Sequence, residues 1–109
     1  MFEKIVSFFK NKKLEWYEPE DSTPWGQCPC CDYLSLPERG NDLICPICFW
    51  EDDGQDVGEL DLRSGPNNGI TLREGRHNFK AFGSCDLAMK KHVVAEAERA
   101  NFEHKPRII

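Results

Sequence analysis

Four cysteines in the first half of the chain form two Cys-x-x-Cys pairs, and their spacing restricts the fold more than any other feature of the sequence. Cys28 and Cys31 form the first pair, Cys45 and Cys48 form the second, and thirteen residues separate the two pairs. A two-residue gap lets a tight turn direct both sulfurs at one ion, and two such turns supply the four thiolates of a tetrahedral site. The spacing therefore predicts one structural zinc ion bound by all four cysteines.

The chain is short, and its size makes a bound metal ion important for stability. Its 109 residues predict a single domain over residues 1–109, and a domain of this size buries only about 60 to 65% of the surface that its unfolded chain exposes. Hydrophobic residues make up 39% of the chain and charged residues 30%, which is typical of a globular protein rather than of a disordered one. Such a domain is expected to need a metal ion as a staple.

The cysteines are expected to stay reduced. The apolar stretch near the start, residues 5–9, is too short for a signal peptide, and no small-residue cleavage site follows it. We therefore expect a cytoplasmic protein whose thiols bind a metal instead of forming disulfides. No apolar run approaches the ~20 residues that a membrane-spanning helix needs, so no membrane association is expected from a spanning segment.

Residues 2–12 predict a short amphipathic helix at the start of the chain. The apolar residues with helical spacing are Phe2, Ile5, Val6 and Phe9. We expect this helix to pack across the metal module and extend its core. The alternative is a helix that binds a partner or lies on a lipid surface.

Residues 22–56 predict a zinc-knuckle module of the zinc-ribbon or rubredoxin-like kind. Residues 33–36 have the pattern of a strand that leaves the first cysteine pair, and after a run of turn residues the segment 43–44 returns to the second pair. The expected result is a β-hairpin with one cysteine pair at its base on each side. Phe49 and Trp50 follow the second pair directly, and we expect them to cover the sulfurs; an aromatic platform for a ligand is the alternative.

Residues 71–102 predict a helical C-terminal part. Thr71 and Glu74 have the spacing of a capping box, which begins a helix at the next residue and lets it end near Gly83. The residues expected on the buried face of this helix are Leu72, Phe79 and Phe82. A second helix is expected from about Asp86, with β-branched residues that weaken its middle. The predicted fold class is α+β: a small zinc-ribbon-like β-hairpin module with an N-terminal amphipathic helix and C-terminal helices.

Two cysteines remain outside the predicted ligand set. Cys30 lies between the members of the first pair, and the two-residue gap from Cys28 selects Cys31 as the ligand. We expect Cys30 and Cys85 to be buried and inert, as small apolar side chains are. For Cys30 the alternatives are a redox-sensitive thiol and a ligand that exchanges with its neighbour.

An acidic segment follows the second cysteine pair. Six of the eleven positions from Glu51 to Asp61 are Asp or Glu, and their spacing does not fit a calcium-binding EF-hand loop. The segment can be a solvated loop, a docking surface for a basic partner, or a catalytic metal cluster. Because the net charge is −5 and the sequence pI about 5.2, we expect no broad attraction to nucleic acid.

Several short sequence motifs follow one another along the chain. They are CPCC at 28–31, LPERG at 36–40, ICPICFWEDDGQ at 44–55, GPN at 65–67 and NFKAFG at 78–83. Over about residues 22–86 the chain resembles the bacterial CPCC-type cysteine-rich protein family. The resemblance implies a small metal-binding domain of a bacterial protein, and some members of that family are reported near toxin genes of interbacterial competition systems.

Two positions depart from the pattern of that family. Asp32 stands where a glycine usually follows the CPCC word, and Gly75 stands within the predicted helix where similar proteins carry a better helix former. Both departures concern the backbone around the metal module and leave the four predicted ligands in place.

The predicted site argues against an enzyme. Four thiolates close the coordination sphere of the ion, which is typical of structural zinc, and the sequence has no phosphate-binding glycine loop, nucleophile elbow or His-Glu-x-x-His motif. A nucleic-acid-binding zinc ribbon is the alternative, but the predicted hairpin carries Arg39 against three acidic residues. A thiol-redox role of Cys30 is the third possibility.

The sequence thus favours a protein-interaction module with one structural zinc. Together with the contexts that the resemblance implies, the acidic segment suggests an immunity-type protein that neutralises a basic bacterial toxin, because an acidic surface speeds association with a basic partner. The residues expected at or near the contact are Trp50, Glu51, Asp52, Asp53 and Asp56, with Trp50 as an anchor if it is exposed.

Overall fold

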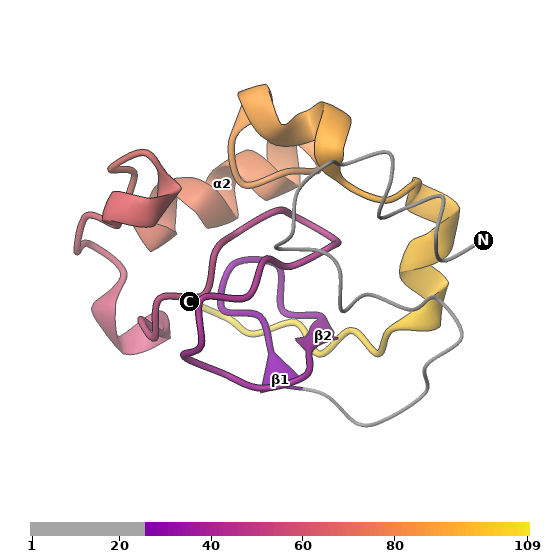
Figure 1. The fold of residues 1–109 in the computed structure, drawn as a ribbon, viewed down its shortest axis with the longest axis horizontal. Helices are drawn as coiled ribbons and strands as arrows, with labels where there is room; N and C mark the ends of the chain where they lie inside the picture. The colour runs from indigo at the N-terminus through magenta and orange to yellow at the C-terminus, as the bar shows by residue number, and fades with distance from the viewer. Residues whose placement is uncertain (1–25) are drawn as a thin grey trace.

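The computed structural model describes residues 26–109; the helix expected over residues 2–12 and the first residues of the predicted 22–56 module lie outside the described residues. Figure 1 shows the cysteine-bearing loops at the centre of the view, with helical segments above them and on both sides. The elements are β1 (Gly26–Gln27), β2 (Leu34–Leu36), the α-helix α2 (Leu72–Phe82) and four 3-10 helices, η2 (Val57–Glu59), η3 (Gly65–Asn67), η4 (Leu87–His92) and η5 (Glu96–Asn101). The described part therefore mixes α and β structure around a small antiparallel hairpin.

The strand after the first cysteine pair forms where it was expected, but its partner differs. β2 pairs antiparallel with β1, which places Gly26 opposite Leu36. Ile44 instead forms an isolated antiparallel bridge with Glu51, on the other side of the second cysteine pair. The predicted pairing of residues 33–36 with residues 43–44 is therefore wrong, because each cysteine pair sits in the loop of its own short hairpin.

The capping box and the end of α2 lie where the sequence predicted them. The Thr71 hydroxyl accepts a hydrogen bond from the Glu74 backbone N–H, the Glu74 carboxylate accepts one from the Thr71 N–H, and Gly83 ends the helix in the left-handed conformation. Leu72 is fully buried, whereas Phe82 in the last turn of α2 is 37% exposed. Beside this turn lies η4, whose Lys90 ammonium donates to the Phe82 carbonyl. The prediction of a buried Phe82 is thus wrong. No helix of the described residues is both long and apolar enough to cross a bilayer.

The second C-terminal helix is divided into two 3-10 helices, η4 and η5. The Asp86 side chain caps η4 by accepting a hydrogen bond from the Ala88 N–H. Between η4 and η5 the chain is extended, and Val94 inserts into the core, where its N–H donates to the Pro46 carbonyl at 3.0 Å. The β-branched residues that weaken helix propensity therefore mark the place where the chain turns inward to pack on the second cysteine loop.

Residues 103–107 form a C-terminal strap along β2 and the first cysteine loop (Figure 1). The Leu34 N–H donates to the Glu103 carbonyl at 2.8 Å, and the Lys105 N–H donates to the Asp32 carbonyl at 3.0 Å. The Tyr33 and His104 rings stack with their centroids 4.1 Å apart. The strap thus extends the small hairpin by one more segment from the far end of the chain.

Gly75, one of the two departures from the family pattern, has a packing reason. A Cβ at this position would lie 3.0 Å from Cζ3 of Trp50 and 3.3 Å from Sγ of Cys30. Although helix propensity alone favours alanine by about 1 kcal/mol, Gly75→Ala is expected to destabilise the metal-loaded protein by about 1 to 3 kcal/mol in denaturant unfolding, because α2 must move away from the core. Ala81→Gly, on the exposed side of the same helix, should cost about 1 kcal/mol from propensity alone. A stabilised Gly75→Ala variant would mean that the core accepts the methyl group.

Candidate metal centre

The two cysteine loops have the same backbone structure. In the first loop the Asp32 N–H donates to the Cys28 carbonyl at 2.9 Å, and in the second the Phe49 N–H donates to the Cys45 carbonyl at 2.8 Å. The residue four positions after the first cysteine is left-handed in both loops, with φ of 68° at Asp32 and 71° at Phe49. A glycine at position 32 would adopt this conformation without strain. Asp32 also tolerates it better than most residues.

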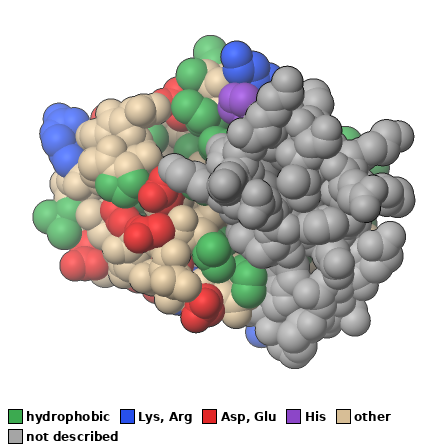
Figure 2. Space-filling model, viewed as in Figure 1, with side chains coloured by type: hydrophobic (Ala, Val, Ile, Leu, Met, Phe, Trp, Pro, Cys, Tyr) green, Lys and Arg blue, Asp and Glu red, His purple; other side chains and the backbone are tan. Residues whose placement is uncertain are grey.

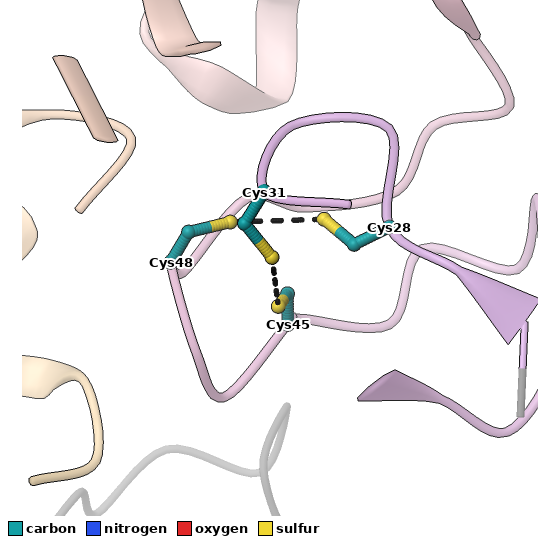
Figure 3. A group of neighbouring side chains, drawn as sticks. All are labelled: Cys28, Cys31, Cys45 and Cys48. Atoms are coloured by element: carbon teal, nitrogen blue, oxygen red, sulfur yellow. Dashed lines mark hydrogen bonds between the residues drawn. The ribbon is translucent and has the colours of Figure 1, made fainter. Parts of the chain in front are cut away.

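The loops bring four sulfurs to one point (Figure 3). The Sγ atoms of Cys28, Cys31, Cys45 and Cys48 all lie within 4.8 Å of one another. The Cys28 and Cys48 sulfurs are 3.7 Å apart, as are those of Cys31 and Cys45. A tetrahedral ion with metal–sulfur bonds of about 2.3 Å separates its ligands by about 3.8 Å. The four predicted cysteines can therefore hold a metal ion of that geometry.

The pKa values of the four buried thiols differ from that of a cysteine in water. All four side chains are buried, and burial raises the pKa of Cys28 to about 11 and the pKa of Cys31 and Cys48 well above its ordinary value. Burial opposes ionisation of Cys45 too, but hydrogen bonds from the other three cysteines and from Ser35 outweigh it and lower the pKa of Cys45. Four thiolates at this place therefore require a cation, and metal binding must release protons.

Two groups from outside the cysteines form hydrogen bonds with the sulfur of Cys45. The Oγ of Ser35 lies 3.0 Å from it, and the backbone N–H of Ile47 donates to it at 3.3 Å. The sequence predicted the four cysteines that gather but not Ser35, because nothing in the cysteine spacing indicates which residue of β2 points at the sulfurs.

Two arginines surround the first cysteine loop. Arg76 from α2 donates to the Pro29 carbonyl at 2.6 Å, and Arg107 from the strap donates to the Cys28 carbonyl at 3.3 Å. Both also pair with the buried Asp32 carboxylate at 2.8 Å. Burial would raise the pKa of Asp32, but the hydrogen bonds from Arg76 and Arg107 outweigh it and lower that pKa. Asp32 therefore ties the loop to α2 and to the strap at once.

Asp32 belongs to a longer chain of ion pairs around the metal centre. Its members, in the order in which neighbours pair, are Arg76, Asp32, Arg107, Asp56, Arg39 and Asp52. Three carboxylates and three guanidinium groups alternate, so their formal charges cancel. The chain links α2, the first cysteine loop, the strap and the acidic segment.

Part of the acidic segment is for this reason bound within the fold rather than free at the surface. The Asp52 side chain is fully buried and accepts hydrogen bonds from Arg39, from Gly40 N–H at 2.7 Å and from Gly54 N–H at 3.1 Å. Asp53 accepts a hydrogen bond from the Ser64 hydroxyl at 2.7 Å. Asp52, one of the residues predicted at the partner contact, is thus engaged within the fold.

The other residues predicted at the partner contact are also buried or half-buried. Trp50 is fully buried, so it does not meet the condition of exposure on which its anchor role depended. Glu51 and Asp56 are half-buried, and Asp56 pairs with Arg39 and Arg107. On the face in Figure 2, the acidic side chains lie in separate groups among neutral ones rather than in one continuous patch.

The structural role of the Asp52 carboxylate can be tested directly. Asp52→Asn is expected to lower the free energy of unfolding by about 3 kcal/mol, because it removes a buried charge that Arg39 and two backbone N–H groups bind. Asp61→Asn removes the same charge from the exposed pair with Arg73 and should have little effect. Urea unfolding of the metal-loaded variants measures both. Equal stabilities would show that the acidic segment is a solvated loop.

The two other cysteines are buried, as the sequence predicted, and lie next to the metal centre. Cys30 and Cys85 are each 2% exposed. Cys30 packs against α2 at Gly75, and the Cys85 N–H donates to the Cys48 carbonyl at 2.8 Å. Burial raises the pKa of the Cys85 thiol, which keeps that thiol protonated and unreactive.

Comparison with known proteins agrees with the cysteine pattern. The family model described as cysteine-rich CPCC matches residues 26–100 of the chain. This range contains both cysteine pairs and α2, and it ends before the strap. No curated protein and no solved structure matches the chain.

Proposed function

This chain belongs to the cysteine-rich CPCC family, and from that premise we propose that it is a non-enzymatic protein-interaction module stabilised by one structural zinc ion. The observation that carries the proposal is the closed site of four buried sulfurs. Four protein ligands fill the coordination sphere of a tetrahedral ion, which leaves no position for a substrate or a reactive water. A metal held in this way supports a surface instead of carrying out a reaction.

Zinc is the proposed ion because four thiolates suit it and because it has no preference among geometries. The protein purified from its own cells is expected to carry one zinc ion per chain, measured by native mass spectrometry together with elemental analysis. Iron at the same site would give a coloured protein with thiolate-to-iron absorption. A folded chain without metal would contradict the proposal.

The narrower proposal is that the partner is a basic toxin that this protein neutralises as an immunity protein. It is supported by the toxin loci that the family resemblance implies and by the net charge of −5, which favours encounter with a basic partner. The contact would use carboxylates that remain at the surface. Examples are Glu38, Asp42 and Glu59, all of which are exposed.

Affinity capture of the tagged protein from its own cells, with and without nuclease, tests the interaction role. A protein partner should be retained at the same yield after nuclease treatment. The double variant Glu38→Lys/Glu59→Lys should associate with that partner more slowly and with a weaker dependence on salt, at unchanged zinc content. A partner that is lost on nuclease treatment would favour the nucleic-acid alternative.

Nucleic-acid binding is expected to be weak. Arg39, the cation of the loop between the two cysteine pairs, donates to Asp52 and Asp56, and Arg73 and Arg76 of α2 pair with Asp61 and Asp32. Neutralised arginines contribute little to phosphate contacts, so a gel-shift titration at physiological salt should show no sub-micromolar binding of DNA or RNA. Tight binding that falls steeply with salt would favour nucleic-acid binding over protein binding as the function.

A further inference from the structure

Ser35 lies against the metal centre although it is not a ligand. Its side chain is fully buried, and its Oγ lies 3.0 Å from the Cys45 sulfur and 3.5 Å from the Tyr33 carbonyl oxygen. A buried hydroxyl needs a hydrogen-bond acceptor. When the site holds a metal, Cys45 is a thiolate, and a charged acceptor at the shorter distance is the stronger of the two.

The four ligand sulfurs are not equivalent in their surroundings. Within residues 26–109, the hydrogen bonds that join a predicted ligand sulfur to a group outside the cysteines both involve Cys45, one with the Ser35 hydroxyl and one with the Ile47 N–H. A divalent ion with four thiolates has a formal charge of −2, here in a site whose four side chains are all buried. Donors placed next to a sulfur spread that charge and orient the ligand.

The fold holds Ser35 firmly in this position. β2 is bound on one side by β1 and on the other by the strap, whose Glu103 carbonyl accepts the Leu34 N–H at 2.8 Å. Neighbouring side chains of a strand point to opposite faces, so the two sets of backbone hydrogen bonds fix the face on which Ser35 lies. The backbone hydrogen bonds of β2 therefore direct the Ser35 side chain toward the Cys45 sulfur.

We propose that Ser35 is a positioning residue of the metal centre, whose hydroxyl donates a hydrogen bond to the Cys45 thiolate and thereby strengthens metal binding. This inference rests on the proposed zinc site. The bond draws electron density from one of the four sulfurs, so it changes the electronic structure of the bound ion as well as its affinity. If Ser35 only filled space, its replacement would change neither the ligand field nor the charge-transfer energy of the bound ion.

Ser35→Ala tests the proposal, and Ser84→Ala is its matched control. Ser84 is also fully buried, but its hydroxyl donates to the Asp86 carbonyl at 2.8 Å. Competition with a chromophoric chelator is expected to show a 10- to 100-fold loss of zinc affinity in Ser35→Ala, the usual effect of removing an outer partner of a metal ligand. Ser84→Ala should lose only a few-fold, through the general cost of a buried hydrogen bond.

Cobalt(II) in place of zinc gives a readout that stability alone does not change. Removing the hydrogen bond raises the energy of the Cys45 lone pairs, so the thiolate-to-cobalt absorption of Ser35→Ala should move to longer wavelength. The spectrum of Ser84→Ala should match wild type. An unshifted Ser35→Ala spectrum would overturn the proposal. A wild-type protein that binds no tetrahedral cobalt would overturn the zinc proposal as well, so the two failures are distinguishable.

A measurement on wild type covers the case in which Ser35→Ala does not fold. In the protein loaded with cadmium-113, a hydrogen bond to the ligand sulfur should produce scalar coupling between the cadmium nucleus and the Ser35 hydroxyl proton, which exchanges slowly because it is buried. A hydroxyl proton without this coupling would mean that Ser35 donates to Tyr33, and the proposal would be wrong.

Discussion

Replacing Cys45 with serine is expected to abolish cooperative folding, because the variant loses one of four ligands of the ion that holds the two cysteine loops together. Structural zinc contributes an apparent 10 to 16 kcal/mol in small zinc domains, about as much as the whole stability of an ordinary domain. Circular dichroism and zinc analysis of the purified variant should show a largely unfolded, metal-free chain. A strong chelator should have the same effect on wild type.

Cys85→Ala is the matched control for that substitution. Cys85 is as deeply buried as the ligands, but its sulfur is not one of the four that gather. Its replacement is expected to cost about 1 to 2 kcal/mol of packing and to leave one zinc per chain. If both variants unfold alike, the four sulfurs are not the ligand set and the loss reflects packing around the loops.

Asp32→Asn is expected to have the second largest effect, a loss of about 3 to 5 kcal/mol from the free energy of unfolding. The substitution keeps the size of the side chain and its tolerance of the left-handed backbone, but it leaves Arg76 and Arg107 without the carboxylate that both bind. Glu103→Gln, which removes a charge from an exposed pair with Lys105, is the control and should stay near wild type. Denaturant unfolding at constant zinc measures both.

The pH dependence of this loss follows from the lowered pKa of Asp32. An unfolded aspartate titrates near pH 4, and the folded carboxylate titrates below that value. The stabilisation is therefore fully present above pH 4 and is lost as the pH falls through the folded pKa. The difference between wild type and Asp32→Asn should stay constant from pH 7 to pH 5. A difference that shrinks within that range would indicate that Asp32 is not bound as a carboxylate.

The sequence was sufficient for features that depend on neighbouring residues. Two-residue gaps identified the four cysteines that gather, because the turn between them is local. The capping box identified the start of α2 for the same reason. The strand after the first cysteine pair was also predicted correctly, but its pairing partner was not. Each cysteine loop folds back on itself, so the strand pairs with the residues before the first cysteine pair and not with the segment that leads to the second pair.

Features that depend on contacts between distant residues could not be predicted from the sequence. The acidic segment has the composition of a docking surface, yet Asp52 is paired with Arg39, 13 positions earlier, and Asp56 with Arg107, 51 positions later. A count of charges does not show which of them meet. Trp50 was expected over the sulfurs, with an anchor role only if it were exposed, but nothing local indicates that α2, through Gly75, packs on its ring.

The strap also bears on the order in which the protein is completed during synthesis. The two cysteine pairs lie within 20 positions of each other, whereas Arg107 joins Asp32 across 75 positions. At about 5 to 20 residues per second, a ribosome makes the second pair within about 1 to 4 seconds of the first and Arg107 only about 4 to 15 seconds after Asp32. A nascent chain can thus take up its ion before Arg107, the second arginine that binds Asp32, exists. A product that stops short of residue 103 would carry all four predicted ligands, with its first cysteine loop bound by Arg76 but not by the strap.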